Sequence, residues 1–280
     1  ADYPQYEFVG EQGLTLFDEA AITKDAAEID RMRDVARRTS DVVRATWDYI
    51  SGHKQADNGQ VINEDGQPLT IGAVKRFIRL ALIERELEDT GMIFAQGRDG
   101  GFPHSRGEDD DILKVGQAIV FDLFPRELGG GYHHDMTRTW CIGHAPDAVK
   151  QAYDLVMEAF DRAVESFGVG KPTRLMDEAV NDVFEAHGHP TLRIDPATTI
   201  GYMHSLGHGV GLKIHEMPRI SFMAQDDQFQ LGNVFTIEPG LYYPEQGFGI
   251  RIEDTVYVAE NGELVTLTDV PKDLVLPLKA

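Results

Sequence analysis

The chain has 280 residues, of which 42% are hydrophobic and 26% charged, a composition typical of a globular enzyme. Its formal net charge of −21 repels nucleic acid and anionic membrane surfaces, so neither is expected as a partner. One cysteine, Cys141, excludes an internal disulfide, and the sequence contains neither an apolar run near the ~18 residues of a membrane span nor a signal peptide. We therefore expect a cytoplasmic protein.

Helical patterns come first along the chain. Residues 1–20 have no clear period, and we interpret them as a linker or the remnant of an absent N-terminal domain. Apolar residues then recur at helical spacing over 24–50 and over 71–89, where Thr70 is a suitable N-cap. Strand-like runs follow at 92–96, 117–124 and 132–142.

The second part of the chain repeats this order. Helices are predicted over 146–167 and 174–187. Strand-like runs follow at 200–204, 213–221, 233–242, 249–258 and 264–268. We predict an α+β fold in which residues 21–280 form a single domain of two pseudo-symmetric halves, with a central site between them.

Four carboxylates lie in apolar, strand-like or turn-like stretches, where an isolated ionised carboxylate is very costly. They are Asp122, Asp135, Glu238 and Glu253. Two divalent cations would balance their charge, and His208 would add one nitrogen ligand. Strand alternation allows Asp122, Asp135 and Glu253 to point into one cleft from separate strands. This arithmetic predicts a two-metal hydrolytic site.

Three histidines and three glycines share the segment 204–218. His204, His208 and His215 surround glycines that let the backbone run close to a bound group. Because the glycines disfavour a helix, we expect a loop that enters a strand, and a helical zinc motif is not expected.

These residues and their surroundings resemble the pita-bread metallopeptidases, which include methionine aminopeptidase, aminopeptidase P and prolidase. The matching phrases are Pro103-His104-Ser105, Phe121-Asp122, the Asp-Met-Thr-Arg-Thr at 135–139, GHGVGLKIHEMP at 207–218, TIEPGLY at 236–242 and GIRIEDT at 249–255. The resemblance covers roughly residues 20–275. It implies a catalytic domain with the family's fold, two halves of antiparallel strands backed by helix pairs.

The resemblance also implies a role for each metal ligand. Asp122 would bind one metal ion and His208 the other, while Asp135 and Glu253 would bridge them. Glu238 would bind the second ion and act as general base on the bridging water. Carboxylate-rich ligation favours manganese, and cobalt, zinc or iron could replace it.

Four further residues are implied to act on substrate. His104, His204 and His215 would hydrogen-bond the substrate and stabilise developing charge, so they are catalytic as well as substrate-binding candidates. Arg251 would orient Glu253 or bind a substrate carboxylate. His204 and Arg251 resemble the proline-specific members. The implied protein is therefore an Xaa-Pro aminopeptidase or Xaa-Pro dipeptidase that acts on peptides with proline at the second position, and it could form a homodimer.

Alternatives to this function stay open. Some relatives hydrolyse or lyse non-peptide small molecules, creatinase-like enzymes among them, and others are non-catalytic pita-bread binding modules with degraded ligands. Some residues are expected to be structural: His133 and His134 on a hairpin surface, and Cys141 in the core.

Overall fold

The structure is a computed structural model that describes residues 4–5, 10 and 13–279. The predicted linker 1–20 therefore lies partly outside the described residues. Its last part forms helix α1 (Leu16–Ala21), which starts at a capping box made by Thr15 and Asp18. Within the described ranges, no helix combines the length and the apolar character that a bilayer crossing requires.

Two helices open the first half. Helix α2 (Ala26–Ser51) begins at Asp25, whose side chain accepts from the Glu28 backbone in a second capping box. Helix α3 (Ile71–Glu84) begins at the predicted N-cap, Thr70, but ends earlier than predicted. The helix stops because Glu86 takes a left-handed φ of 55° and the next residues leave the helix axis. They form β3 (Leu87–Glu88), which pairs with β6 (Arg126–Glu127).

The first sheet has the order β15-β7-β5-β4. Its strands are β4 (Met92–Gln96), β5 (Ala118–Leu123), β7 (Met136–Ile142) and β15 (Val275–Leu276). β4, β5 and β7 are antiparallel, whereas β15 returns from the C-terminal end to pair in parallel with β7. Beside this sheet lie the hairpin β1 (Lys54–Gln55) and β2 (Val61–Ile62), and the short helix η1 (Asp99–Gly101).

The second half begins with α4 (Asp147–Ser166) and α5 (Arg174–Ala186). Its five-stranded sheet has the order β14-β13-β10-β8-β9. The strands are β8 (Gly207–Gly209), β9 (Glu216–Ile220), β10 (Val234–Ile237), β13 (Asp254–Val258) and β14 (Leu264–Thr266). A separate hairpin joins β11 (Gly240–Tyr243) to β12 (Phe248–Arg251) through η2 (Pro244–Gln246).

Three predicted strands of the second half differ from the structure. The runs 233–242 and 249–258 each break into two strands, because the chain leaves the pairing of β10 with β13 and enters the pairing of β11 with β12. The run 200–204 makes only isolated bridges. Conversely, β8 lies in the segment that we expected to be a loop. These differences depend on pairing partners that are distant in sequence.

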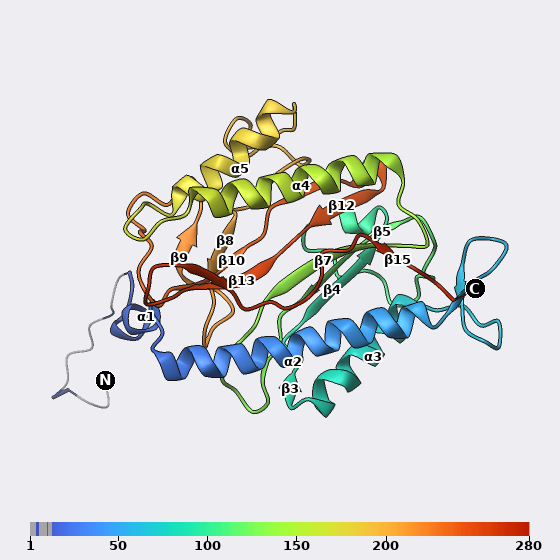
Figure 1. Cartoon of the computed structure of the whole chain (residues 1–280), viewed down its shortest axis with the longest axis horizontal. Coiled ribbons are helices and arrows are strands. Elements are labelled where there is room, and N and C mark those ends of the chain that lie inside the picture. Colours follow the sequence, from blue (N-terminus) through green and yellow to red (C-terminus); the bar gives the residue numbers. More distant parts are fainter. Residues whose placement is uncertain (1–3, 6–9, 11–12, 280) are drawn as a thin grey trace.

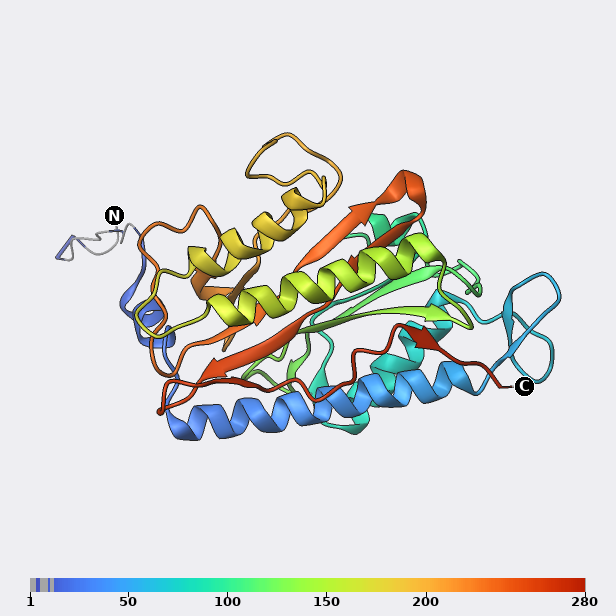
Figure 2. The same ribbon diagram turned by 45° about the horizontal axis from the view of Figure 1, so that its top comes forward.

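Each helix pair packs with strands of its own half. Figures 1 and 2 show α2 along one side of the strands and α4 with α5 along the other. One hydrophobic cluster joins α2 and α3 to β4, β5 and β7. The partly buried Trp47 packs against it, edge-to-face on Trp140 with 5.4 Å between the ring centroids. A second cluster joins α4 and α5 to β10, β12 and β13, and it contains the buried Cys141. The α+β class and the repeated order of helix pair and strands are confirmed.

Candidate metal centre

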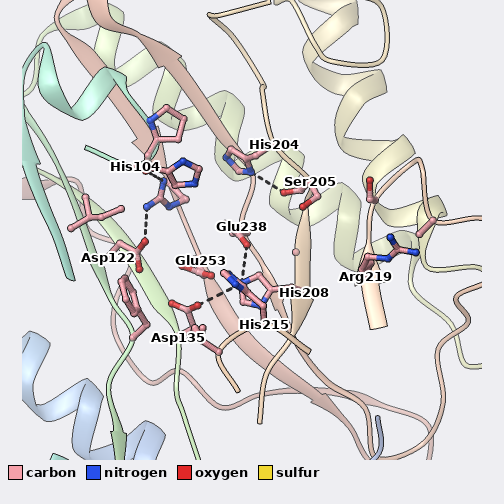
Figure 3. A pocket seen from close by; sticks show the side chains of 18 of the residues that line it. His104, Asp122, Asp135, His204, Ser205, His208, His215, Arg219, Glu238 and Glu253 are labelled. Atoms are coloured by element: carbon pink, nitrogen blue, oxygen red, sulfur yellow. Dashed lines mark hydrogen bonds and ion pairs between the residues drawn. The ribbon is translucent and has the colours of Figure 1, made fainter. Parts of the chain in front are cut away.

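All nine sequence-predicted site residues line one cavity of about 530 Å³ between the two halves. They are His104, Asp122, Asp135, His204, His208, His215, Glu238, Arg251 and Glu253. Figure 3 shows that the two aspartates approach from the first sheet and that the histidines of 204–215 approach from the opposite side. The fold thus brings together residues that are up to 149 positions apart in the chain (253 − 104).

The two aspartates are placed by the first sheet. Asp122 lies inside β5, opposite Ile93 of β4 and Thr137 of β7. Asp135 immediately precedes β7, and its backbone oxygen accepts a hydrogen bond of 2.7 Å from the Thr255 hydroxyl of β13. Backbone register therefore holds both carboxylates before any ligand contributes.

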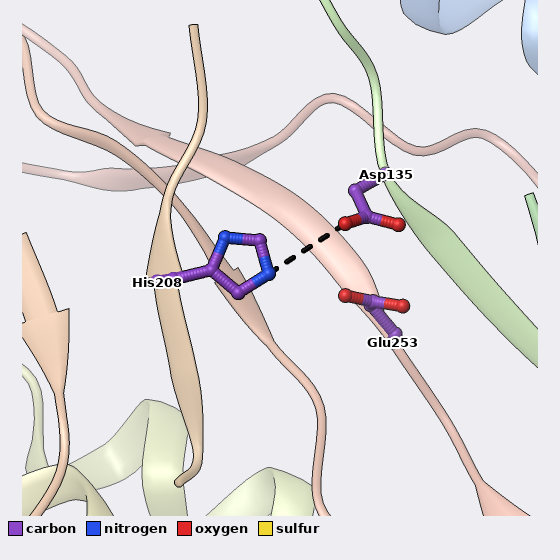
Figure 4. A group of neighbouring side chains, drawn as sticks. All are labelled: Asp135, His208 and Glu253. Atoms are coloured by element: carbon purple, nitrogen blue, oxygen red, sulfur yellow. Dashed lines mark ion pairs between the residues drawn. The ribbon is translucent and has the colours of Figure 1, made fainter. Parts of the chain in front are cut away.

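The remaining candidate ligands come from the second half. Nε2 of His208 lies 3.6 Å from Oδ2 of Asp135 and 3.4 Å from Oε1 of Glu238. One ligand atom each of Asp135, His208 and Glu253 lies within 4.8 Å of the others (Figure 4). Two atoms that ligate one ion at about 2.0–2.2 Å lie roughly 3–4 Å apart, so these separations suit a shared ion better than direct hydrogen bonds.

Hydroxyl groups orient the two glutamates. The Thr137 hydroxyl donates to Oε2 of Glu253 at 2.6 Å. The Thr236 hydroxyl lies 3.2 Å from Oε1 of Glu238 and also accepts from the backbone N–H of His208 at 3.1 Å. Thr236 thereby ties one carboxylate and the imidazole segment to a single hydroxyl. Neither threonine was predicted to have a role in the site, although both lie inside the phrases that carry the family resemblance.

Burial disfavours the ionised form of the four carboxyl groups of the site. Burial raises the pKa of Asp122 and raises the pKa of Glu238 to about 8. Burial and the nearby carboxylates raise the pKa values of Asp135 and Glu253 well above their ordinary range. Burial lowers the pKa of His208 to about 4, so its imidazole is neutral at pH 7 and offers a lone pair. The four carboxylates need more positive charge than the one guanidinium beside them, that of Arg251, supplies.

A divalent metal ion fits this donor set. Oδ1 of Asp122 and Oδ1 of Asp135 are buried and accept no hydrogen bond from any residue that the structure describes. Unpaired buried carboxylate oxygens are costly, and a cation would satisfy them. Four carboxylates with one imidazole form an oxygen-rich set that suits manganese and related divalent ions.

Glycines set the position of His208 by close backbone packing. A Cβ at Gly207 would overlap the backbone oxygen of Thr236, and one at Gly209 would overlap that of Met217. We expected these glycines to admit a bound group, and the structure instead uses them to bring β8 against its neighbouring strands. Substitution there would push the imidazole away from the carboxylates.

The guanidinium of Arg251 is 3% exposed and is committed to protein partners. It donates 2.7 Å to Oδ2 of Asp122 and 2.8 Å to the hydroxyl of Tyr242. Its Nε donates to the Thr137 hydroxyl, which itself donates to Glu253, so the contact with Glu253 is indirect. Tyr242 also lies 2.9 Å from Nε2 of His204. Tyr242 was not among the predicted site residues, although it is the last residue of the TIEPGLY phrase.

The open part of the cavity carries the other histidines. His104 and His215 are exposed, and the ring of His215 stands nearly perpendicular to that of His208 at 4.3 Å. Burial lowers the pKa of His204 to about 3 and also lowers that of His215. Further lining residues were not predicted and carry no obvious sequence signal: Ile93, Arg106, Phe124, Ser205, Ile214, Arg219, Ser221, Met223 and Ala224.

The prediction for His133 and His134 was wrong. They are 6% and 1% exposed instead of lying on a hairpin surface. The backbone N–H of His133 donates to the Gly211 oxygen at 2.8 Å, and Nε2 of His134 lies 3.3 Å from the Thr268 hydroxyl. The second half covers this end of the hairpin, which sequence alone does not reveal. Neither histidine lines the cavity.

The model of metallopeptidase family M24 matches residues 30–260. The chain belongs to this family. It is 38% identical over 191 residues to an Xaa-Pro dipeptidase of Pyrococcus furiosus, a match that covers 68% of this chain and 50% of the relative. It is 31% identical over 257 residues to a probable dipeptidase, PepE, of Mycobacterium tuberculosis, covering 91% of this chain and 60% of the relative. The chain spans about half the length of the curated relatives it matches first.

Solved structures of this M24 family share the fold. An X-Pro aminopeptidase from Thermotoga maritima superposes with a TM-score of 0.76 at 27% identity, over 94% of this chain and 66% of the other. A prolidase from Pyrococcus furiosus gives a TM-score of 0.74 at 28% identity, over 91% of this chain and 68% of the other. The predicted pita-bread fold is therefore confirmed.

Proposed function

We propose that this M24 chain is the catalytic part of a dinuclear metal-dependent exopeptidase that hydrolyses Xaa-Pro peptide bonds. The supporting observation is the convergence of three buried carboxylates, the partly buried Glu238 and a neutral imidazole, with unpaired oxygens on Asp122 and Asp135. The names of its relatives, Xaa-Pro dipeptidase and X-Pro aminopeptidase, support the choice of substrate.

Five residues are proposed to hold the two metal ions: Asp122, Asp135, His208, Glu238 and Glu253. Manganese is the proposed metal, with cobalt, zinc or iron as replacements. Bound ions would supply activation of a water at neutral pH and polarisation of the scissile carbonyl. Arg251 neutralises and orients Asp122 through its hydrogen bond of 2.7 Å, so that the other oxygen of that carboxylate stays available.

The chain's own groups are proposed to do the proton transfer and the orientation of substrate. Glu238 is proposed as the base that accepts a proton from the attacking water. Burial raises its pKa to about 8 in the metal-free site, and bound cations would favour the ionised carboxylate that this role requires. His104, His204 and His215 face the cavity and hydrogen-bond the substrate as charge develops. A cavity of about 530 Å³ is large enough for a short peptide and lies within the usual 300–1,000 Å³ of small-ligand sites.

The test compares Gly-Pro with a longer Xaa-Pro-Xaa peptide, using the complete natural protein loaded with Mn²⁺. Hydrolysis of either peptide supports the proposal, and cleavage of Gly-Pro alone selects a dipeptidase. Hydrolysis of neither would overturn it. Activity restricted to a small-molecule panel would favour the creatinase-like alternative, and absence of bound metal together with absence of hydrolysis would favour a binding module.

The organisation of the whole protein is part of the same proposal. Residues 21–280 are proposed as one catalytic domain and residues 1–20 as the segment leading into it. A homodimer and a cytoplasmic location stay predictions, which analytical ultracentrifugation and cell fractionation of the natural protein would test.

A further inference from the structure

One buried carboxylate outside the metal centre has no part in the chemistry described above. Asp177 lies in the first turn of α5 and is 0% exposed. Burial raises its pKa to about 6. Burial of a carboxyl group lowers the stability of a fold unless hydrogen bonds compensate for the lost solvation. Asp177 has such hydrogen-bond partners, and they belong to segments that reach the cavity.

Asp177 binds two separate segments at once. Its Oδ1 accepts 2.7 Å from the Tyr202 hydroxyl, and its Oδ2 accepts 2.7 Å from the backbone N–H of Phe222. Asn181, one turn further along α5, lies with Nδ2 3.2 Å from the same Oδ1. All three contacts are directional, and two of them come from chain segments that reach the cavity.

The first segment leads to a substrate-facing histidine. Tyr202 is 1% exposed, and its ring packs edge-on against that of His204 with 5.3 Å between ring centroids. His204 and Ser205 line the cavity. The position of the Tyr202 ring therefore helps to define where the imidazole of His204 stands.

The second segment is another part of the cavity lining, which we call the 219–224 wall. Its cavity-lining members are Arg219, Ser221, Met223 and Ala224. Helix α5 holds this wall at two points, because the Thr173 hydroxyl just before α5 donates 2.7 Å to the Arg219 oxygen while Asp177 accepts from Phe222. Figure 3 shows Arg219 on the far side of His204 and Ser205 from Asp122 and Asp135.

We propose that Asp177 is a positioning residue that fixes the relative position of two lining segments of the substrate cavity, by clamping the His204 segment and the 219–224 wall to α5. It acts through these neighbours and does not touch substrate. A peptide that fills the cavity contacts both sides of the clamp, so its ground-state binding depends on their separation. The effect on KM rests on the proposed peptidase function, whereas the clamp itself does not.

The test uses graded variants at one position. Asp177→Asn can still accept from the Phe222 N–H, but its amide nitrogen then replaces Oδ1 and no longer accepts from Tyr202 or Asn181. Asp177→Leu removes both acceptor oxygens at similar volume. Tyr202→Phe removes only the contact that leads to His204. Asp182→Asn makes the same chemical change on the same helix, at an exposed side chain paired with Arg193, and serves as the matched control.

Two measurements decide the outcome. Amide hydrogen exchange at Phe222, in protein without substrate or metal, is expected to accelerate at least about tenfold in Asp177→Leu and less in Asp177→Asn. KM for Xaa-Pro substrate is expected to rise roughly tenfold in Asp177→Leu, with kcat changing less than KM, while Asp182→Asn behaves as wild type.

Unchanged Phe222 exchange in the Asp177 variants would overturn the clamp, whether or not the protein is a peptidase. A lower Tm with unchanged KM would reduce Asp177 to a structural role and would also overturn the proposal. If Asp177→Leu does not fold, Tyr202→Phe still tests the end of the clamp that leads to His204, because it removes only the hydroxyl that binds Asp177; an unchanged KM in Tyr202→Phe would then overturn the proposal.

Discussion

The two sheets hold their metal-site residues in different ways. In the first sheet, Asp122 lies inside a continuous ladder, with β4 and β7 paired on either side of it. In the second half, the site residues lie where ladders are interrupted. His208 lies at a register shift, Glu238 follows the end of β10, and Glu253 separates β12 from β13.

This difference shows how a rigid site can be built without regular pairing. A ladder fixes a side chain through backbone register, so Asp122 needs little local help. A residue at a strand break has lost part of that support, and other contacts must replace it. Here the replacements are the hydroxyls of Thr137 and Thr236 and the close backbone packing at Gly207 and Gly209.

The largest expected effect is on turnover. Glu238→Gln removes the proposed base at a strand break while keeping the shape of the side chain, so kcat should fall about 10³-fold. Circular dichroism and Tm should show an intact fold. The control is Glu245→Gln, at an exposed side chain of η2. Appreciable activity in Glu238→Gln would remove the base role.

The next effect concerns the glycine packing of the second sheet. Gly209→Ala places a Cβ against the backbone of Met217, and we expect the free energy of unfolding to fall by about 3 kcal/mol in urea titrations. Gly52→Ala at the end of α2 is the control, because its Cβ would have ordinary contacts of 3.4–3.5 Å and its φ is −69°. Equal stability of the two variants would contradict the role of close packing in placing β8.

Metal binding should stabilise the fold, because the candidate ligands come from both halves of the chain. At a free Mn²⁺ concentration about 100 times Kd, the free energy of unfolding should rise by about 2.7 kcal/mol, and chelation should reverse the gain. Asp135→Asn should abolish this response, since Asp135 lies in the cluster with His208 and Glu253. Asp110→Asn, in an exposed acidic loop, should keep it. A Mn²⁺ response that survives Asp135→Asn would place the ion elsewhere.

The smallest effect isolates one supporting hydroxyl. Thr236→Val removes the group that holds both Glu238 and the His208 backbone, and we expect metal affinity to fall about tenfold by isothermal titration calorimetry. Thr39→Val, at an equally buried threonine of α2, is the control for buried hydroxyl loss. Equal affinities in the two variants would mean that the strand break needs no such support.

Much of the site could be predicted from sequence, because charged residues in apolar stretches indicate carboxylates that need a counter-charge. Asp122, Asp135 and Glu253 stand in apolar stretches typical of buried strands, and a shared counter-charge is the simplest way to offset the cost of burying three ionised groups. That argument places them in one cavity without a structure, and the cavity contains all of them. The helices were predictable for a related reason, since their apolar spacing and their N-caps, such as Thr70, are local.

The residues that support the ligands could not be predicted in this way. Tyr242, Thr236 and Asp177 are ordinary polar residues in sequence, and their roles depend on partners in other strands or helices. The strand breaks at 238–239 and 252–253 likewise exist because the chain changes partners there. His133 and His134 were misplaced for the same reason, because distant residues cover them.

The sequence by itself determined the residue types of a metal site, the helix–helix–strand repeat and the resemblance to one family. The tertiary structure decided which residues hold each ligand in place, where the ladders break and which segments form the cavity walls. Periodicity and the cost of buried charge act within a short stretch of chain, whereas register, burial by other segments and hydrogen bonds across the cavity exist only after distant parts of the chain have met.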